Sequence, residues 1–165
     1  MYKRSYATVF SIVLLHTFAN ASAEPTIPFV DGIWRGEVET GPNGSGFKEC
    51  WASTTFGDGT TFTLAKRDDA SWHLRLSNPG WQLPPSRRYD MIALVDFYPQ
   101  EVSVTAEAKS ETRLDIANLD QNSLLGLIEN GHTIDLTSDG LNEKYDLEGS
   151  AKAIQRIRNC FADRS

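Results

Sequence analysis

"CWASTTFGDGTTFTLAK", residues 50–66, contains two alternating segments on either side of a short turn. In both segments small or apolar residues occupy every second position, and Gly57-Asp58-Gly59 separates them. Alternation with period two is typical of a β-strand that buries one face. A glycine-rich turn between two such segments favours a hairpin. The stretch therefore predicts an antiparallel β-hairpin.

Further segments with strand patterns lie on both sides of this hairpin. They cover residues 34–39, 72–77, 89–97, 101–109, 113–118, 132–137 and 144–149. The segment 89–97 is apolar on both faces, which indicates a central strand. Short strands at such regular spacing indicate an all-β architecture. We therefore expect a mainly β fold, an antiparallel sandwich or barrel of about eight or nine strands.

Two segments have helical spacing instead. "DQNSLLGLIENG" predicts a short helix near residues 120–129, with Asp120 as its N-cap. "SAKAIQRIRNCF" has apolar residues at i, i+3, i+4 and i+7. This spacing predicts a C-terminal helix near residues 150–161, with Ser150 as its N-cap and one face packed on the sheet.

Cys50 and Cys160 are the only cysteines of the chain. Two cysteines in an exported chain indicate a disulfide. Cys50 lies in the hairpin and Cys160 on the apolar stripe of the last helix, so a bond would fasten that helix to an early strand. A metal site is not expected, because the cysteines and the histidines His73 and His132 match no ligand spacing.

The first 23 residues have the features of a secretory signal peptide. Lys3 and Arg4 precede an uncharged run from residue 7 to 15, and "ASA" at 21–23 fits a signal-peptidase site. The alternative is an N-terminal membrane anchor, but a spanning helix needs about 20 apolar residues and this run is too short. We expect a signal peptide at 1–23 and a single β-rich domain at 24–165. The mature protein would then be periplasmic or secreted, without a membrane span.

The expected mature chain is acidic. It has 14 Lys and Arg residues against 22 Asp and Glu residues, a net charge of −8. Binding to nucleic acid requires clustered basic residues, so nucleic acid is not an expected partner. The negative charge serves solubility or attracts a basic partner.

No catalytic or cofactor motif is present. The closest approach to a Gly-x-Ser-x-Gly nucleophile frame is "NGSG" around Ser45, which reads as a flexible loop. No serine, cysteine or carboxylate stands at a spacing that implies partnership with His73 or His132, so both are expected to be surface histidines. No glycine-rich phosphate loop occurs, and no cofactor is expected.

The loop "NPGWQLPPSRR", residues 78–88, is the one candidate binding element. Trp81 stands between proline- and glycine-containing turns, and Arg87 and Arg88 follow. Tryptophan and arginine are enriched in binding hot spots. Alternatively, Trp81 folds back onto the end of the barrel and the two arginines are merely exposed.

The order of these segments resembles small, mostly uncharacterised exported domains of α-proteobacteria and, more distantly, the invasion-associated locus B proteins. The stretches that carry the resemblance are "DGTTFTLAKRDDASWHLRLSNPGWQL" and "LEGSAKAIQRIRNC". The resemblance implies a periplasmic or secreted β-domain with a terminal helix. It supplies no active-site residue.

Two classes of function remain from the sequence. The first is an exported, non-enzymatic module that binds a protein or an envelope component, with Trp81, Arg87 and Arg88 as candidate contact residues. The alternative is a hydrolase-type enzyme whose site is assembled from residues distant in sequence. A paired acid and base in one cleft would favour the enzyme.

Overall fold

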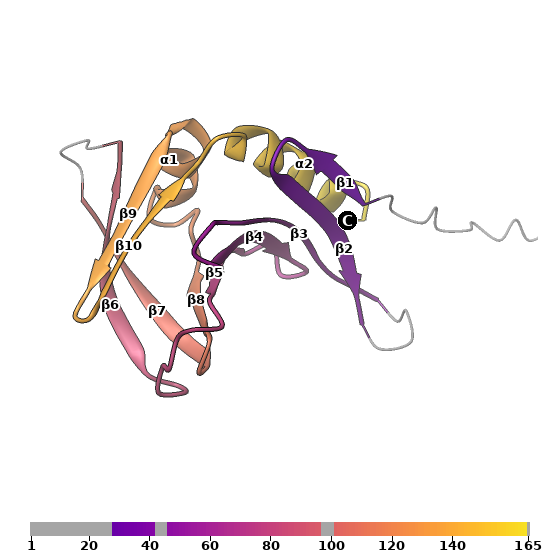
Figure 1. Ribbon diagram of the computed structural model, residues 1–165. Helices are drawn as coiled ribbons and strands as arrows, with labels where there is room; N and C mark the ends of the chain where they lie inside the picture. The colour runs from indigo at the N-terminus through magenta and orange to yellow at the C-terminus, as the bar shows by residue number, and fades with distance from the viewer. Residues whose placement is uncertain (1–27, 42–45, 97–100, 165) are drawn as a thin grey trace, which may run out of the picture.

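The computed structural model describes residues 28–41, 46–96 and 101–164, which form one antiparallel sheet and two helices (Figure 1). The strands are β1 (Phe29–Asp31), β2 (Trp34–Thr40), β3 (Phe47–Thr55), β4 (Thr61–Arg67), β5 (Trp72–Ser77), β6 (Arg88–Val95), β7 (Val102–Ser110), β8 (Arg113–Ala117), β9 (Thr133–Ser138) and β10 (Leu141–Asp146). The helices are α1 (Leu124–Asn130) and α2 (Ser150–Ala162). The signal peptide expected at 1–23 and the loop residue Ser45 lie outside the described residues.

The predicted class, mainly β and antiparallel with a short helix and a C-terminal helix, is confirmed. The strands form one open sheet in the order β1-β2-β3-β4-β5-β8-β7-β6-β9-β10, so the described sheet has two edges and is not closed into a barrel. The strand beyond the expected eight or nine is β1, which lies in a proline-containing segment with no alternating pattern. The last strand begins at Leu141 because Asp139 and Gly140 form a two-residue turn after β9.

The sheet curves strongly, and α1 and α2 lie next to each other along one rim of it, at the top of the view, from β9 across to β2 (Figure 1). Its inner face carries the core. The alternating positions of the 50–66 hairpin lie there, with Cys50, Phe62 and Leu64 fully buried. Tyr145 of β10 contacts the rings of Phe56 and Phe62 at centroid distances of 5.1 and 5.6 Å. These contacts bring the β10 edge of the sheet close to the β3–β4 hairpin.

Helix α2 packs its predicted apolar stripe against β2, β3 and β4. Ala153, Ile154 and Ile157 are fully buried. The helix starts at Ser150, but the prediction that Ser150 is its N-cap is wrong, because Gly149 takes that place with a φ of 81°. The Ser150 hydroxyl instead donates to the main-chain oxygen of Ile128, at 2.6 Å. It thereby ties α2 to α1.

The N-cap predicted for α1 is also misplaced. The helix begins at Leu124, four residues after Asp120, and Ser123 precedes it in a left-handed conformation. The Asn122 side chain accepts the N–H of Leu124 at 3.1 Å. The turn that leads into α1 therefore takes up the first four residues, 120–123, of the segment that was expected to be helical.

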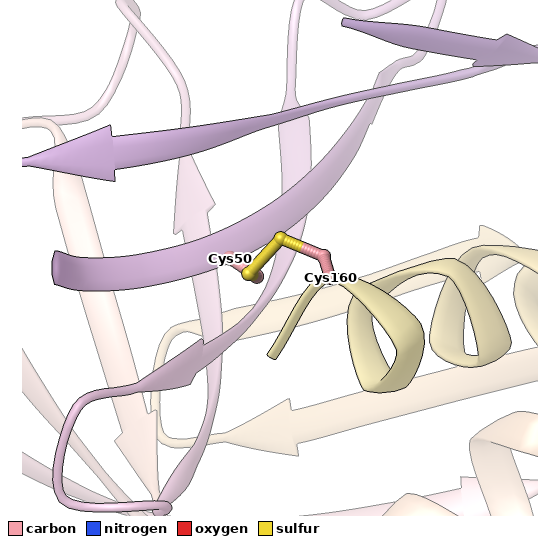
Figure 2. The surroundings of a disulfide bond; sticks show 2 residues. All are labelled: Cys50 and Cys160. Atoms are coloured by element: carbon pink, nitrogen blue, oxygen red, sulfur yellow. A yellow bond between two sulfur atoms is a disulfide. The ribbon is translucent and has the colours of Figure 1, made fainter. Parts of the chain in front are cut away.

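A disulfide joins β3 to α2 (Figure 2). Cys50 and Cys160 have their Cα atoms 6.1 Å apart and are separated by 110 residues in sequence. This is the pairing that the sequence pattern predicts. The bond anchors the C-terminal helix to the β3–β4 hairpin.

Neither described helix combines the length and the apolar character that crossing a bilayer would require.

Candidate functional site

The loop at residues 78–88 is held by its own polar groups. The Asn78 side chain donates to Thr60 Oγ1 at 2.8 Å and accepts the N–H of Gly80 at 2.7 Å. Leu83 is buried, and its N–H donates to the main-chain oxygen of Glu111. The loop is therefore attached to two neighbouring turns of the sheet, β3–β4 and β7–β8.

The three residues singled out in this loop do not form one patch. Trp81 is half-buried and packs against the hydrophobic core. Arg87 and Arg88 are exposed, and the Arg87 guanidinium lies over the Tyr89 ring at 4.9 Å from its centroid. Both arginines line a hollow that Trp81 does not reach.

We call this feature the β6 hollow. Its volume is about 490 Å³. Its lining includes Arg87, Arg88, Asp90, Ile92, Thr137 and Asp139. It arises because β9 pairs with β6 only from Ile92 to Val95, whereas β6 begins at Arg88. The first four residues of β6 thus have a described strand partner, β7, on one side only.

A second constellation lies on the outer face, opposite the core, and includes His73, which the sequence pattern predicts to be solvent-exposed. That expectation is wrong for His73, of which only 8% is exposed. Its Nδ1 lies 2.8 Å from Asp115 Oδ1, and its Nε2 lies 3.0 Å from Ser71 Oγ. Serine, histidine and aspartate are therefore aligned in the order of a hydrolase triad.

The groups around Asp115 favour the charged form of its carboxylate. Burial raises the pKa of Asp115, but the hydrogen bond and attraction to His73 and the positive charge of Arg75 outweigh it. The pKa therefore lies below its ordinary value, and the carboxylate holds the imidazole in a fixed orientation.

The position of the Ser71 proton argues against a nucleophile. Ser71 Oγ lies 2.5 Å from Asp69 Oδ1, closer than to His73. A hydroxyl has one proton to donate, and the carboxylate of Asp69 can only accept. Donation from the Ser71 hydroxyl and N–H holds the pKa of Asp69 below its ordinary value. The proton that His73 would need to abstract is therefore directed into the β4–β5 turn.

Sequence spacing held no signal for this constellation. Strand β5 pairs with β8 rather than with β6, the next strand in the chain. This pairing places Asp115 beside Arg75, 40 positions away, and within reach of His73. The only usable signal was the pattern of charged residues on the outward positions of β5 and β8.

The same part of the outer face contains a charged pocket of about 260 Å³. We call it the outer-face pocket. Its lining includes Glu49, Arg67, His73, Arg75, Arg113 and Asp115. Glu49 is 4% exposed and forms an ion pair with Arg75. Among the described residues, no group of three or more histidine, cysteine or acidic side chains is placed to hold a metal ion.

Comparison with known proteins supports the fold. The chain is similar in structure to the crystal structure of invasion associated protein B from Bartonella henselae, with a TM-score of 0.56. The match covers 83% of this chain and 99% of that chain, at 13% sequence identity. No family model matches the sequence, and no curated protein does. At this identity the likeness establishes a shared fold.

Proposed function

We propose that this protein is an exported, non-enzymatic module of the bacterial envelope that binds a protein through the β6 hollow. One observation carries the proposal. Two adjacent exposed arginines flank a hollow at which a strand is left open on one side. The disulfide and the structural likeness to a bacterial invasion-associated protein are consistent with an extracytoplasmic bacterial protein.

The chemistry of the hollow suits an extended protein segment. Strand β6 projects past β9, so its main chain can pair with an added strand, a common mode of peptide recognition. Ile92 is 39% exposed beside the hollow and offers an apolar contact. Arg87 is pre-oriented by the Tyr89 ring, which reduces the entropy lost on binding.

Site-specific photo-cross-linking in the native envelope tests this surface. A photoreactive amino acid at Ile92 should give a defined adduct with one envelope protein, and Arg88→Glu should abolish it. The matched control places the same amino acid at Ala151, an exposed position of α2. No adduct at Ile92, or the same adduct at Ala151, would contradict the proposed surface.

Export is tested by intact-mass measurement of the protein recovered outside the cytoplasm. We expect a chain that begins at Glu24, because the small-x-small site ends at Ala23. A recovered chain that retains residues 1–23 would contradict the cleaved signal.

Hydrolysis is the second candidate, favoured by the alignment of Ser71, His73 and Asp115. Because Asp69 takes the serine proton, we expect the wild-type domain to cleave activated esters no faster than the Ser71→Ala variant. Asp69→Asn weakens the competing acceptor and serves as the second variant. If the wild-type domain hydrolyses activated esters and Ser71→Ala abolishes this turnover, the protein is an enzyme and the proposal of a non-enzymatic binding module is contradicted.

A further inference from the structure

The outer-face pocket concentrates positive charge on an acidic protein. Five cationic side chains line it, namely those of Lys48, Arg67, Arg75, Lys109 and Arg113, against three carboxylates. These five are more than a third of the 14 Lys and Arg residues beyond position 23. A cationic concavity on a negatively charged surface attracts and focuses anions.

Two arginines of the pocket take no part in its ion pairs. Lys48 pairs with Glu39, Arg75 with Glu49, and His73 with Asp115. Lys109 pairs with Glu107 at its rim. Arg67 and Arg113 form no ion pair with the described residues, although both line the pocket.

The hydrogen bonding of the arginines is also incomplete. The Nε–H groups of Arg67 and Arg75 are buried and have no hydrogen-bond acceptor among the described residues. Leaving a buried charged donor unpaired is unfavourable. Guanidinium groups bind the oxygens of phosphate with paired hydrogen bonds. The chemistry of these donors therefore matches a phosphate group.

A neighbouring hollow of about 360 Å³ continues the pocket along the outer face and shares Glu39, Glu49, Arg75 and Arg113 with it. Its other lining residues differ in character from the charged pocket. Trp51 is half-buried there, and the same hollow is lined by four residues with hydroxyl groups, Ser53, Thr61, Thr63 and Ser77. A tryptophan ring beside several hydroxyls offers an apolar face and polar contacts at once, which suits a sugar ring.

From these two adjoining hollows we infer that the outer face binds a small soluble sugar phosphate. The phosphate lies among Arg67, Arg75 and Arg113, and the sugar lies over Trp51. This site is separate from the β6 hollow, with which it shares no lining residue. A result that contradicts one of the two proposed sites therefore leaves the other unaffected.

Calorimetric titration of the mature domain at low ionic strength tests the site with three probes: a hexose monophosphate, inorganic phosphate and the neutral hexose. The hexose monophosphate should bind most tightly and the neutral hexose least. Arg113→Gln should weaken the affinity for the hexose monophosphate about tenfold or more, because the substitution removes charge-assisted hydrogen bonds. Arg156→Gln, at an exposed position of α2, is the matched control and should change nothing.

Trp51→Ala separates the two halves of the site. It should weaken the binding of the hexose monophosphate and leave the binding of inorganic phosphate unchanged. Circular dichroism of the variant should show an intact fold. Equal loss for both probes would overturn the placement of the sugar on Trp51. Absence of hexose monophosphate binding to the wild type, or equal effects of Arg113→Gln and Arg156→Gln, would overturn the site itself.

Discussion

At the scale of single residues, carboxylates that accept main-chain N–H groups hold the turns of this protein. Asp58 accepts the N–H and the hydroxyl of Thr60 in the β3–β4 turn. Asp96, at the end of β6, accepts the N–H groups of His132 and Thr133 at 2.8 Å each. These bonds, the one from Thr133 first, lower the pKa of Asp96.

The first prediction concerns Asp96→Asn. Because the pKa of Asp96 is lower in the folded state, its charge stabilises the fold above the unfolded-state pKa. That contribution is lost as the pH falls through the folded-state pKa. The variant should therefore melt below the wild type at neutral pH, and the two melting temperatures should converge in acid. Thermal unfolding followed across this pH range measures the difference.

Asp120→Asn is the matched control, since Asp120 is exposed in the turn before α1. It should leave the pH profile of stability unchanged. A gap between Asp96→Asn and wild type that stays constant down to strongly acidic pH would show that the charge of Asp96 has no part in stability.

At the scale of elements, the entry into α2 depends on close packing against β2. Trp34 of β2 is fully buried, and its Nε1 donates to the main-chain oxygen of Glu148 at 2.7 Å. Gly149 follows with a positive φ, and a Cβ there would lie 3.1 Å from the Trp34 ring. The tryptophan and the glycine together set the direction in which the helix leaves β10.

The second prediction compares Gly149→Ala with Gly140→Ala. Both glycines have a positive φ, of 81° and 85°, so each substitution should cost about 1–2 kcal/mol from backbone strain. Space around Gly140 is open, whereas Gly149 faces Trp34. Chemical denaturation should therefore show a larger loss of unfolding free energy for Gly149→Ala. Equal losses of unfolding free energy would mean that the Trp34 ring moves away from the added methyl group without destabilising the fold.

At the scale of the whole molecule, the disulfide connects parts of the chain that are far apart in sequence. Cys50 belongs to the β3–β4 hairpin, and Cys160 lies in the last turn of the final helix, α2. Closing a loop of this length restricts the unfolded chain far more than the folded one. The bond therefore stabilises the attachment of α2 to the sheet.

The third prediction concerns the variant that carries both Cys50→Ala and Cys160→Ala. It should lose about 2–5 kcal/mol of unfolding free energy relative to the oxidised wild type. The same unfolding measurement on wild type in reductant should approach the value for the variant. If oxidised and reduced wild type unfold at the same denaturant concentration, the bond does not contribute to stability.

The period-two and helical patterns were enough to predict nine of the ten described strands and both helices, and the presence of two cysteines in the chain was enough to predict their pairing. The inward positions of the 50–66 hairpin are buried as expected, because alternation is a local property of an extended chain. Helix caps were predicted less well. Ser150 has the chemistry of an N-cap, but its hydroxyl binds the main chain of Ile128, a contact that depends on the packing of α1.

By itself, therefore, the sequence determined which face of each strand is apolar and where most strands and helices lie. Only the tertiary structure decided which outward-facing residues meet. Strand β5 pairs with β8, so His73 meets Asp115, and β9 stops short of the start of β6, so Arg87 and Arg88 border a hollow. The physical reason is that alternation specifies a face but not a neighbour. Strand order and register follow from the burial of the whole core, to which distant segments contribute together.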